Sequence, residues 1–345
     1  MKRLLIIIDG MDDEKIPELG NLTPSRFARM PALDYMREHG VTTLEVTVPE
    51  ANTPATDVAL LKILGYDVNP NFEGRSWFEA LGQGVEVGDN DLCLRCNLIS
   101  IKDGIIVSHS GNDLSASESD YITELLKSKF ESDKIKIYGT GTFRQIVVIK
   151  DCSSNIECNP PHELIGQDVG SLRIKADDEE TQKELNRIIE ESRNLLRQCK
   201  ANGIALWAPG RRKEFSPKID GTIVAGVSLV KGIGKALGMQ VADVAGATGD
   251  DHTDYHAKLK TAINALNEKD FLILHIEAAD EASHERDYKK KVKILEEIDE
   301  KILQPLLNLD EDVEITVQAD HATSSMTGKH LNVSVEVVKF KTRKR

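Results

Sequence analysis

Six acidic and histidine side chains in three distant segments have the spacing expected of a two-metal site. The set is Asp9, Asp280, His284, Asp320, His321 and His330. Asp280 and His284 are four residues apart, so one helical turn brings both side chains to a single ion. Asp320 and His321 are adjacent, and their side chains point to different sides, which suits two neighbouring ions. Carboxylates and imidazoles in this combination suit Mn²⁺, Zn²⁺ or Mg²⁺.

Each of these residues also has a purely structural explanation when it is taken alone. Asp9 can begin an Asx turn, and Asp280 can cap a helix. His321 can be a hydrogen-bonded core residue, and His330 can be a surface residue. We favour the metal site because all of them follow strand-like segments that can converge.

Thr56 is the candidate nucleophile beside such a site. Residues 52–61 have the pattern of a loop that enters a helix, and Thr56 falls at the helix N-terminus. Backbone N–H groups there favour a developing alkoxide and a phosphate oxygen. The alternative is that Thr56 only caps the helix.

Three apolar segments must position these residues. Residues 4–8 and 271–276 are continuous apolar runs, as in strands buried on both faces, and residues 313–317 are rich in β-branched side chains. Residues 288–306 carry an apolar stripe with helical spacing, and Pro305 is expected to end that helix. The pattern predicts an α/β fold with a mostly parallel sheet flanked by helices, in which ligands bind at the carboxyl ends of the strands.

The middle of the chain has a different pattern. Short alternating runs at 135–138 and 145–149 precede one long helical pattern, which indicates an inserted α+β unit. We therefore expect a discontinuous catalytic core at 1–100 and 200–345, with a smaller lid domain at 101–199.

Composition limits the class of partner and the compartment. The 345 residues carry 44 basic and 57 acidic side chains, a formal charge of −13, which argues against binding to nucleic acid or to an anionic membrane. Five cysteines without a secretory leader indicate a reducing, cytoplasmic location. No apolar stretch approaches the length of a membrane span. The lysines at 289–291 are expected on a solvated helix face.

The order of these motifs resembles the alkaline phosphatase superfamily. Within it the chain is most similar to the archaeal-type cofactor-independent phosphoglycerate mutases, and among these to the branch proposed as homoserine kinases. Among the motifs that carry the resemblance are Asp9-Gly10-Met11, Thr56-Asp57-Val58-Ala59, Leu64-Gly65-Tyr66-Asp67, Arg95-Cys96-Asn97, Pro160-Pro161-His162, Gly246-Ala247-Thr248-Gly249 and Asp280-Glu281-Ala282.

The resemblance implies interconversion of 3-phosphoglycerate and 2-phosphoglycerate, small phosphorylated metabolites, through a phosphorylated Thr56. It implies two divalent ions, with Mn²⁺ expected and Zn²⁺ or Mg²⁺ as alternatives, and no 2,3-bisphosphoglycerate. One ion would be held by Asp280, His284 and His330, and the other by Asp9, Thr56, Asp320 and His321. Substrate would be held by Arg95, Asn97, Arg144, His162 and Arg211.

Some positions depart from the mutase pattern and leave alternatives open. Thr56 replaces the usual serine, and Trp207 and Glu277 resemble the proposed homoserine kinase branch. A second hypothesis is therefore phosphoryl transfer to a small hydroxyl amino acid, with Glu277 holding its ammonium group. A third is a metal-binding protein without turnover. Arg95 and Arg144 can also be surface ion pairs. The sequence leaves the oligomeric state open.

Overall fold

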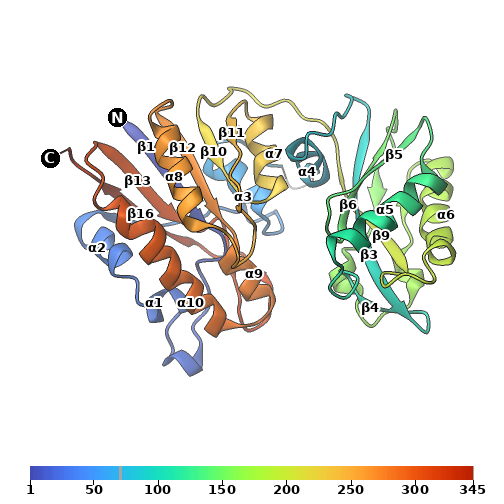
Figure 1. Cartoon of the computed structure of the whole chain (residues 1–345), viewed down its shortest axis with the longest axis horizontal. Helices are drawn as coiled ribbons and strands as arrows, with labels where there is room; N and C mark the ends of the chain where they lie inside the picture. The colour runs from blue at the N-terminus through green and yellow to red at the C-terminus, as the bar shows by residue number, and fades with distance from the viewer. Residues whose placement is uncertain (70–71, 345) are drawn as a thin grey trace. The chain divides into compact units, whose positions relative to one another are not determined.

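The computed structural model describes residues 1–69 and 72–344. They divide into two compact units, each of which has its own core (Figure 1). Unit 1 comprises residues 1–72 and 215–345, and unit 2 comprises residues 73–214.

The described residues of unit 1 form a seven-stranded sheet in the order β11-β10-β12-β1-β13-β16-β2. Its strands are β1 (Lys2–Ile8), β2 (Val41–Glu45), β10 (Thr222–Val224), β11 (Gln240–Ala242), β12 (Phe271–Ile276), β13 (Val313–Gln318) and β16 (Val335–Lys341). Pairing is parallel from β11 to β13, and antiparallel between β13, β16 and β2. The predicted mostly parallel sheet is therefore confirmed.

Helices cover both faces of this sheet. They are α1 (Pro24–Phe27), α2 (Pro31–His39), α3 (Thr56–Ile63), α7 (Ser228–Ala236), α8 (Tyr255–Leu266), α9 (Ala278–His284), α10 (Tyr288–Ile298) and α11 (Gln304–Leu306). On β10, Val224 packs in the core with α8 and α10, while its neighbour Ile223 contacts Gly234 of α7 on the other face. This double burial explains why β1 and β12 are apolar at successive positions.

The helical pattern of residues 288–306 is confirmed, with one difference. A π-helical turn at Asp299–Leu303 separates α10 from α11, and Pro305 lies inside α11. The helix ends at Leu306, one residue after Pro305, in agreement with the predicted end. Short elements complete unit 1: the 3-10 turn Pro17–Leu19, β14 (Ala322–Thr323) and β15 (His330–Leu331).

Unit 2 contains a five-stranded sheet within its described residues, in which β3 pairs with β4, β6 and β9, and β5 pairs with β6. The strands are β3 (Leu92–Lys102), β4 (Ile105–Ser108), β5 (Ile135–Tyr138), β6 (Arg144–Ile149) and β9 (Gly203–Gly210), with β7 (Ile156–Glu157) and β8 (Lys175–Ala176) as a separate pair. The helices are α4 (Arg75–Gly82), α5 (Ala116–Phe130), α6 (Glu179–Leu195) and the 3-10 turns Pro161–Leu164 and Val169–Leu172.

The boundaries of unit 2 differ from the predicted 101–199. A boundary after residue 100 would cut β3, which pairs with β6 on one side and with β9 on the other. These hydrogen bonds hold all three strands in one unit, so it begins at residue 73 and ends at residue 214. Because nearly the whole of β3 is buried, its sequence lacks the regular alternation of polar and apolar residues by which a half-buried strand is recognised.

Candidate metal centre

Three parallel strands of unit 1 end at the same edge of the sheet. β1 lies between β12 and β13, and Ile7 pairs with His275 on one side and with Gln318 on the other. The backbone N–H of Asp9 donates to the Ile276 carbonyl at 2.8 Å. This register brings the segments after all three strands together.

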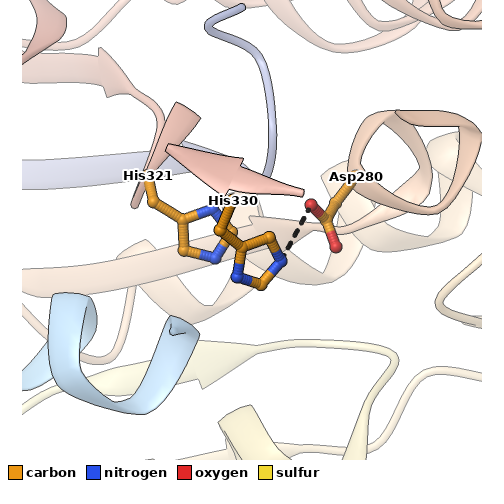
Figure 2. A group of neighbouring side chains, drawn as sticks. All are labelled: Asp280, His321 and His330. Atoms are coloured by element: carbon orange, nitrogen blue, oxygen red, sulfur yellow. Dashed lines mark ion pairs between the residues drawn. The ribbon is translucent and has the colours of Figure 1, made fainter. Parts of the chain in front are cut away.

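The first predicted group of ligands comes together at α9 and β15. His284 Nε2 lies 3.0 Å from Asp280 Oδ2 and 3.0 Å from His330 Nε2. His330 Nε2 lies 3.6 Å from Asp280 Oδ1. His321 also lies here, since Asp280, His321 and His330 each offer a ligand atom and these atoms lie within 4.8 Å of one another (Figure 2).

The second predicted group lies deeper, where β1 and β13 end. Asp9, Asp320 and His321 are 0–1% exposed. His321 Nε2 lies 3.4 Å from Asp320 Oδ2 and 3.8 Å from Asp9 Oδ1. Among the described residues, none of these three atoms has a hydrogen-bond partner.

This donor set fits divalent cations. Buried polar atoms without partners are costly, and a cation accounts for several of them at once. Metal–ligand bonds of about 2.0–2.2 Å separate neighbouring ligand atoms by about 3 Å. The separations of 3.0–3.8 Å within the two groups are close to that value.

Backbone carbonyls orient two of the imidazoles. His284 Nδ1 lies 2.8 Å from the Gly328 carbonyl, and His330 Nδ1 lies 2.9 Å from the Pro54 carbonyl. A carbonyl only accepts hydrogen bonds, so each Nδ1 carries the hydrogen. In the neutral form of each ring, Nε2 then has a lone pair for a cation, as in ligating histidines whose second nitrogen is held by the protein.

Thr323 connects the two groups of ligands. Its hydroxyl donates to Asp280 Oδ1 at 2.6 Å and lies 3.2 Å from His321 Nδ1. Because that single hydrogen goes to the carboxylate, the hydroxyl accepts from His321 Nδ1–H. His321 Nε2 is then free of hydrogen and able to ligate.

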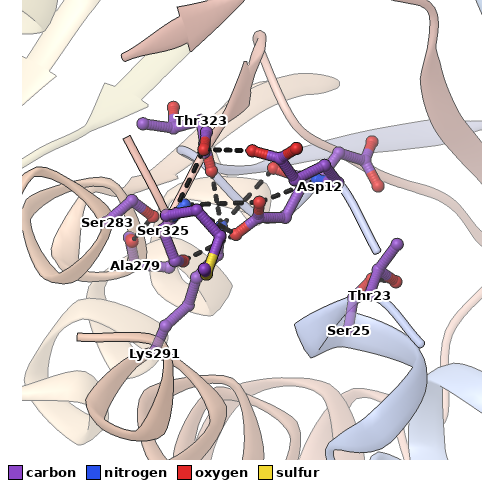
Figure 3. Close-up of polar contacts among 12 residues, drawn as sticks. Asp12, Thr23, Ser25, Ala279, Ser283, Lys291, Thr323 and Ser325 are labelled. Atoms are coloured by element: carbon purple, nitrogen blue, oxygen red, sulfur yellow. Dashed lines mark hydrogen bonds and ion pairs between the residues drawn. The ribbon is translucent and has the colours of Figure 1, made fainter. Parts of the chain in front are cut away.

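A buried lysine holds the backbone of Thr323 (Figure 3). Lys291 Nζ donates to the Thr323 carbonyl at 3.0 Å and to Asp13 Oδ2 at 2.8 Å. Asp13 also accepts from the Ser325 hydroxyl at 2.6 Å. Lys291 is 0% exposed, so the prediction of a solvated lysine face at 289–291 is wrong for this residue.

The charges of the centre are strongly coupled. Burial raises the pKa of Asp9 well above its usual value, and the carboxylate of Asp320 raises it further. Burial also acts to raise the pKa of Asp280, yet the hydrogen bonds from His284 and His330 hold it well below its usual range. Burial lowers the pKa of His284, but Asp280 more than offsets this and raises it to about 9. The metal-free centre thus retains a proton that a cation would displace.

Thr56 is the first residue of α3 and is buried. The N-cap residue is Ala55, so the alternative that Thr56 merely caps the helix is wrong. The Pro54 carbonyl, two residues earlier, accepts from His330 Nδ1, which brings the start of α3 to the first ligand group.

Three of the predicted substrate-binding residues meet around Trp207 in unit 2. The Arg95 guanidinium lies 4.7 Å from the Trp207 ring centroid, and Arg95 Nε lies 3.0 Å from Glu79 Oε2. Trp207 Nε1 donates to Asn97 Oδ1 at 2.9 Å, and the His162 ring lies 5.7 Å from the Trp207 ring. Arg95 is 5% exposed, so its ion pair is buried and the surface-pair alternative is wrong.

The other two predicted substrate-binding residues lie elsewhere in unit 2. The Arg144 guanidinium lies 4.7 Å from the Phe143 ring centroid. Arg211 donates to the carbonyls of Cys152 and Ser154, the latter at 2.6 Å. Arg211 thereby fixes the loop before β7, and its predicted contact with substrate stays a prediction.

Comparison with known proteins identifies the family. A model of the family described as "2,3-bisphosphoglycerate-independent phosphoglycerate mutase" matches residues 38–202. A protein of that name from Methanosarcina mazei is 34% identical over 100% of this chain and 91% of its own length. The chain belongs to this family. The predicted relationship to the mutases is confirmed.

Further mutase relatives and solved structures agree. A "probable" mutase of the same name from Geobacter sulfurreducens is 33% identical over 99% of this chain and 90% of its own length. The structure of protein PH0037 from Pyrococcus horikoshii matches 99% of this chain and 87% of its own, with a TM-score of 0.80 and 25% identity. A cofactor-independent phosphoglycerate mutase from Thermoplasma acidophilum, at 22% identity, matches the fold over 100% of this chain and 91% of its own, with a TM-score of 0.58. The predicted fold class is confirmed.

Two polar residues near the candidate metal centre were not among the predicted site residues. His275 is fully buried on β12, with Nε2 3.4 Å from Asp9 Oδ2. Lys258 on α8 is also buried and donates to the His275 carbonyl at 3.2 Å. A histidine in the middle of an apolar strand is the one signal that could have found His275. Nothing in the pattern of α8 marks Lys258.

No helix in the described part of the chain could cross a membrane.

Proposed function

We propose that this chain interconverts 3-phosphoglycerate and 2-phosphoglycerate, with Thr56 carrying the phosphoryl group between the two hydroxyls. The names of its relatives support the reaction. One structural observation supports the role of Thr56. His330, a member of the first ligand group, binds the Pro54 carbonyl in the loop that precedes Thr56.

In the proposed reaction, Thr56 Oγ1 attacks phosphorus and loses its proton. The bond between phosphorus and the substrate oxygen breaks, and that oxygen takes up a proton. The other hydroxyl of the glycerate then attacks the phosphothreonine, loses its proton and releases Thr56. Backbone N–H groups at the start of α3 are suited to hold the phosphate oxygens.

We propose two divalent cations for the centre, Mn²⁺ first, with Zn²⁺ or Mg²⁺ as alternatives. One group of ligands is Asp280, His284 and His330, and the other is Asp9, Thr56, Asp320 and His321. When bound, these ions would lower the pKa of the Thr56 hydroxyl and offset charge on the phosphoryl group. The family description itself states independence from 2,3-bisphosphoglycerate.

For the rest of the substrate we propose Arg95, Asn97, Arg144 and His162 as partners of phosphate and carboxylate oxygens. Arginine and amide donors match such oxygens in geometry and charge. The lid role of the inserted unit and the cytoplasmic location stay predictions.

The test is whether Thr56 becomes phosphorylated. We expect mass spectrometry of the peptide containing Thr56, after exposure to 3-phosphoglycerate and Mn²⁺, to detect a phospho-form. Thr56→Ala should lower mutase activity by at least about a thousandfold, because the nucleophile is lost, and Thr56→Ser should retain part of it. Thr53→Ala, on an exposed residue of the same loop, is the matched control.

The same assay distinguishes the two alternatives, which the relatives do not favour. The kinase hypothesis predicts that incubation with ATP and homoserine gives phosphohomoserine. It also predicts that incubation with 3-phosphoglycerate gives no 2-phosphoglycerate. Full activity in Thr56→Ala would contradict any role of this hydroxyl in the reaction. Binding of Mn²⁺ without any activity in the wild type would favour a metal-binding protein without turnover.

A further inference from the structure

His275 is a buried imidazole that faces the metal centre without a hydrogen bond. It is 0% exposed, and among the described residues neither of its ring nitrogens has a hydrogen-bond partner. Its Nε2 lies 3.4 Å from Asp9 Oδ2. That distance is long for an N–H···O bond, but it suits two ligands of one ion.

Asp9 directs its two oxygens to different imidazoles. Oδ1 lies 3.8 Å from His321 Nε2, on the side of the second group, while Oδ2 faces His275. Asp9, His275 and Glu277 each offer a ligand atom, and these atoms lie within 4.8 Å of one another. A carboxylate can use its two oxygens for two ions, so Asp9 is placed to bridge them.

The charge of the centre also favours another cation. The carboxylates of Asp280, Asp320 and Glu277 all act on Asp9, which makes four carboxylates at one place. Two divalent ions would offset these four, but a phosphoryl group adds about two more negative charges. Lys258 supplies one positive charge near Glu277, although its ammonium group donates to backbone carbonyls.

We propose that Asp9, His275 and Glu277 form a third divalent-cation site, with Asp9 bridging to the site of Asp320 and His321. Two carboxylates and one imidazole suit Mn²⁺ or Mg²⁺. The inference rests on the proposed function only in taking the other two groups as cation sites.

The test is the number of ions bound per chain. Metal-free full-length protein is dialysed against Mn²⁺ in excess potassium salt, which suppresses diffuse binding to an acidic surface, and bound metal is measured by mass spectrometry. We expect three ions in the wild type and two in His275→Leu. Two ions in the wild type would overturn the proposal. Fewer than two in His275→Leu would also overturn it, because His275 would then belong to another group.

Two further variants keep the test independent of folding and of catalysis. Glu277→Gln keeps the shape of the side chain and should lower the affinity for the third ion at least about tenfold, while the other two ions stay bound. His39→Leu removes an exposed imidazole from α2 and should still bind three ions. Three bound ions without mutase activity would contradict the proposed function and leave the third site supported.

Discussion

Thr323 shows how one hydroxyl can set the state of two ligands. It donates to Asp280 and accepts from His321, so it fixes a carboxylate of one group and the tautomer of an imidazole in the other. Thr323→Val keeps the shape and removes both hydrogen bonds. We expect affinity for Mn²⁺ to fall about 10- to 100-fold, as for other residues that orient metal ligands. Isothermal titration calorimetry measures this.

The serine variant separates orientation from packing. Thr323→Ser keeps the hydroxyl and should bind Mn²⁺ nearly as well as the wild type. Thr327→Val, on an exposed residue of the same loop, should have no effect. Equal affinity in Thr323→Val and the wild type would show that Asp280 and His321 need no such support.

His284 predicts how metal binding depends on pH. Its pKa in the metal-free protein is raised from 6.5 to about 9 by Asp280. The contact therefore stabilises the folded metal-free protein fully below pH 6.5, and this contribution is lost as pH rises through about 9. A cation must displace the proton, so Mn²⁺ affinity should rise by up to about tenfold per pH unit between these values.

Titrations at several pH values test this dependence. His284→Gln should bind Mn²⁺ more weakly and with a flatter pH dependence, because no proton is displaced from this position. Titrations in buffers of different ionisation enthalpy should detect the released proton in the wild type. An affinity that falls with rising pH would contradict the assignment.

At the scale of elements, Gly10 lets the loop after β1 pass next to α9. Its φ is +66°, and a Cβ atom there would lie 2.7 Å from the Asp280 Cα. Gly10→Ala should therefore reduce the free energy of unfolding by more than the roughly 1–2 kcal/mol of a left-handed alanine. It should also weaken Mn²⁺ binding, because Asp280 must move.

Gly20 provides a control for this prediction. Its φ is +69°, but a Cβ atom there would have no neighbour within 4 Å. Gly20→Ala therefore carries the backbone strain without the clash, and should leave metal binding unchanged. Chemical denaturation measures both variants, and equal losses of stability would show that α9 can move aside at little cost.

The same elements explain what could be predicted from the sequence. β1 and β12 were recognisable because both faces are buried and their runs are apolar, and β13 was recognisable because it is rich in β-branched residues. Parallel strands end together, so the predicted ligands after them could be grouped. The burial of Lys291 could not be predicted from the sequence, because its partner Asp13 lies 278 residues away. The start of unit 2 was hidden for a similar reason, since β3 is joined to β9 only by long-range pairing.

At the scale of the whole molecule, two separate cores predict two separate responses to metal. The core of unit 1 is built around β1, β12 and β13, and that of unit 2 around β3, β6 and β9. All proposed cation ligands belong to unit 1. A ligand that binds only the folded form stabilises the unit that binds it, by about 2.7 kcal/mol at 100 times its Kd.

Differential scanning calorimetry of the full chain should therefore give two transitions, of which Mn²⁺ raises the Tm of only one. Asp320→Asn removes a charged ligand from unit 1 and should reduce that shift, because the cation then loses part of its binding energy. The transition that does not respond should match the unfolding of a fragment of residues 73–214, which contains a complete core. If Mn²⁺ raised both transitions equally, cations would have to bind unit 2 as well, or the two cores would have to unfold as one cooperative structure.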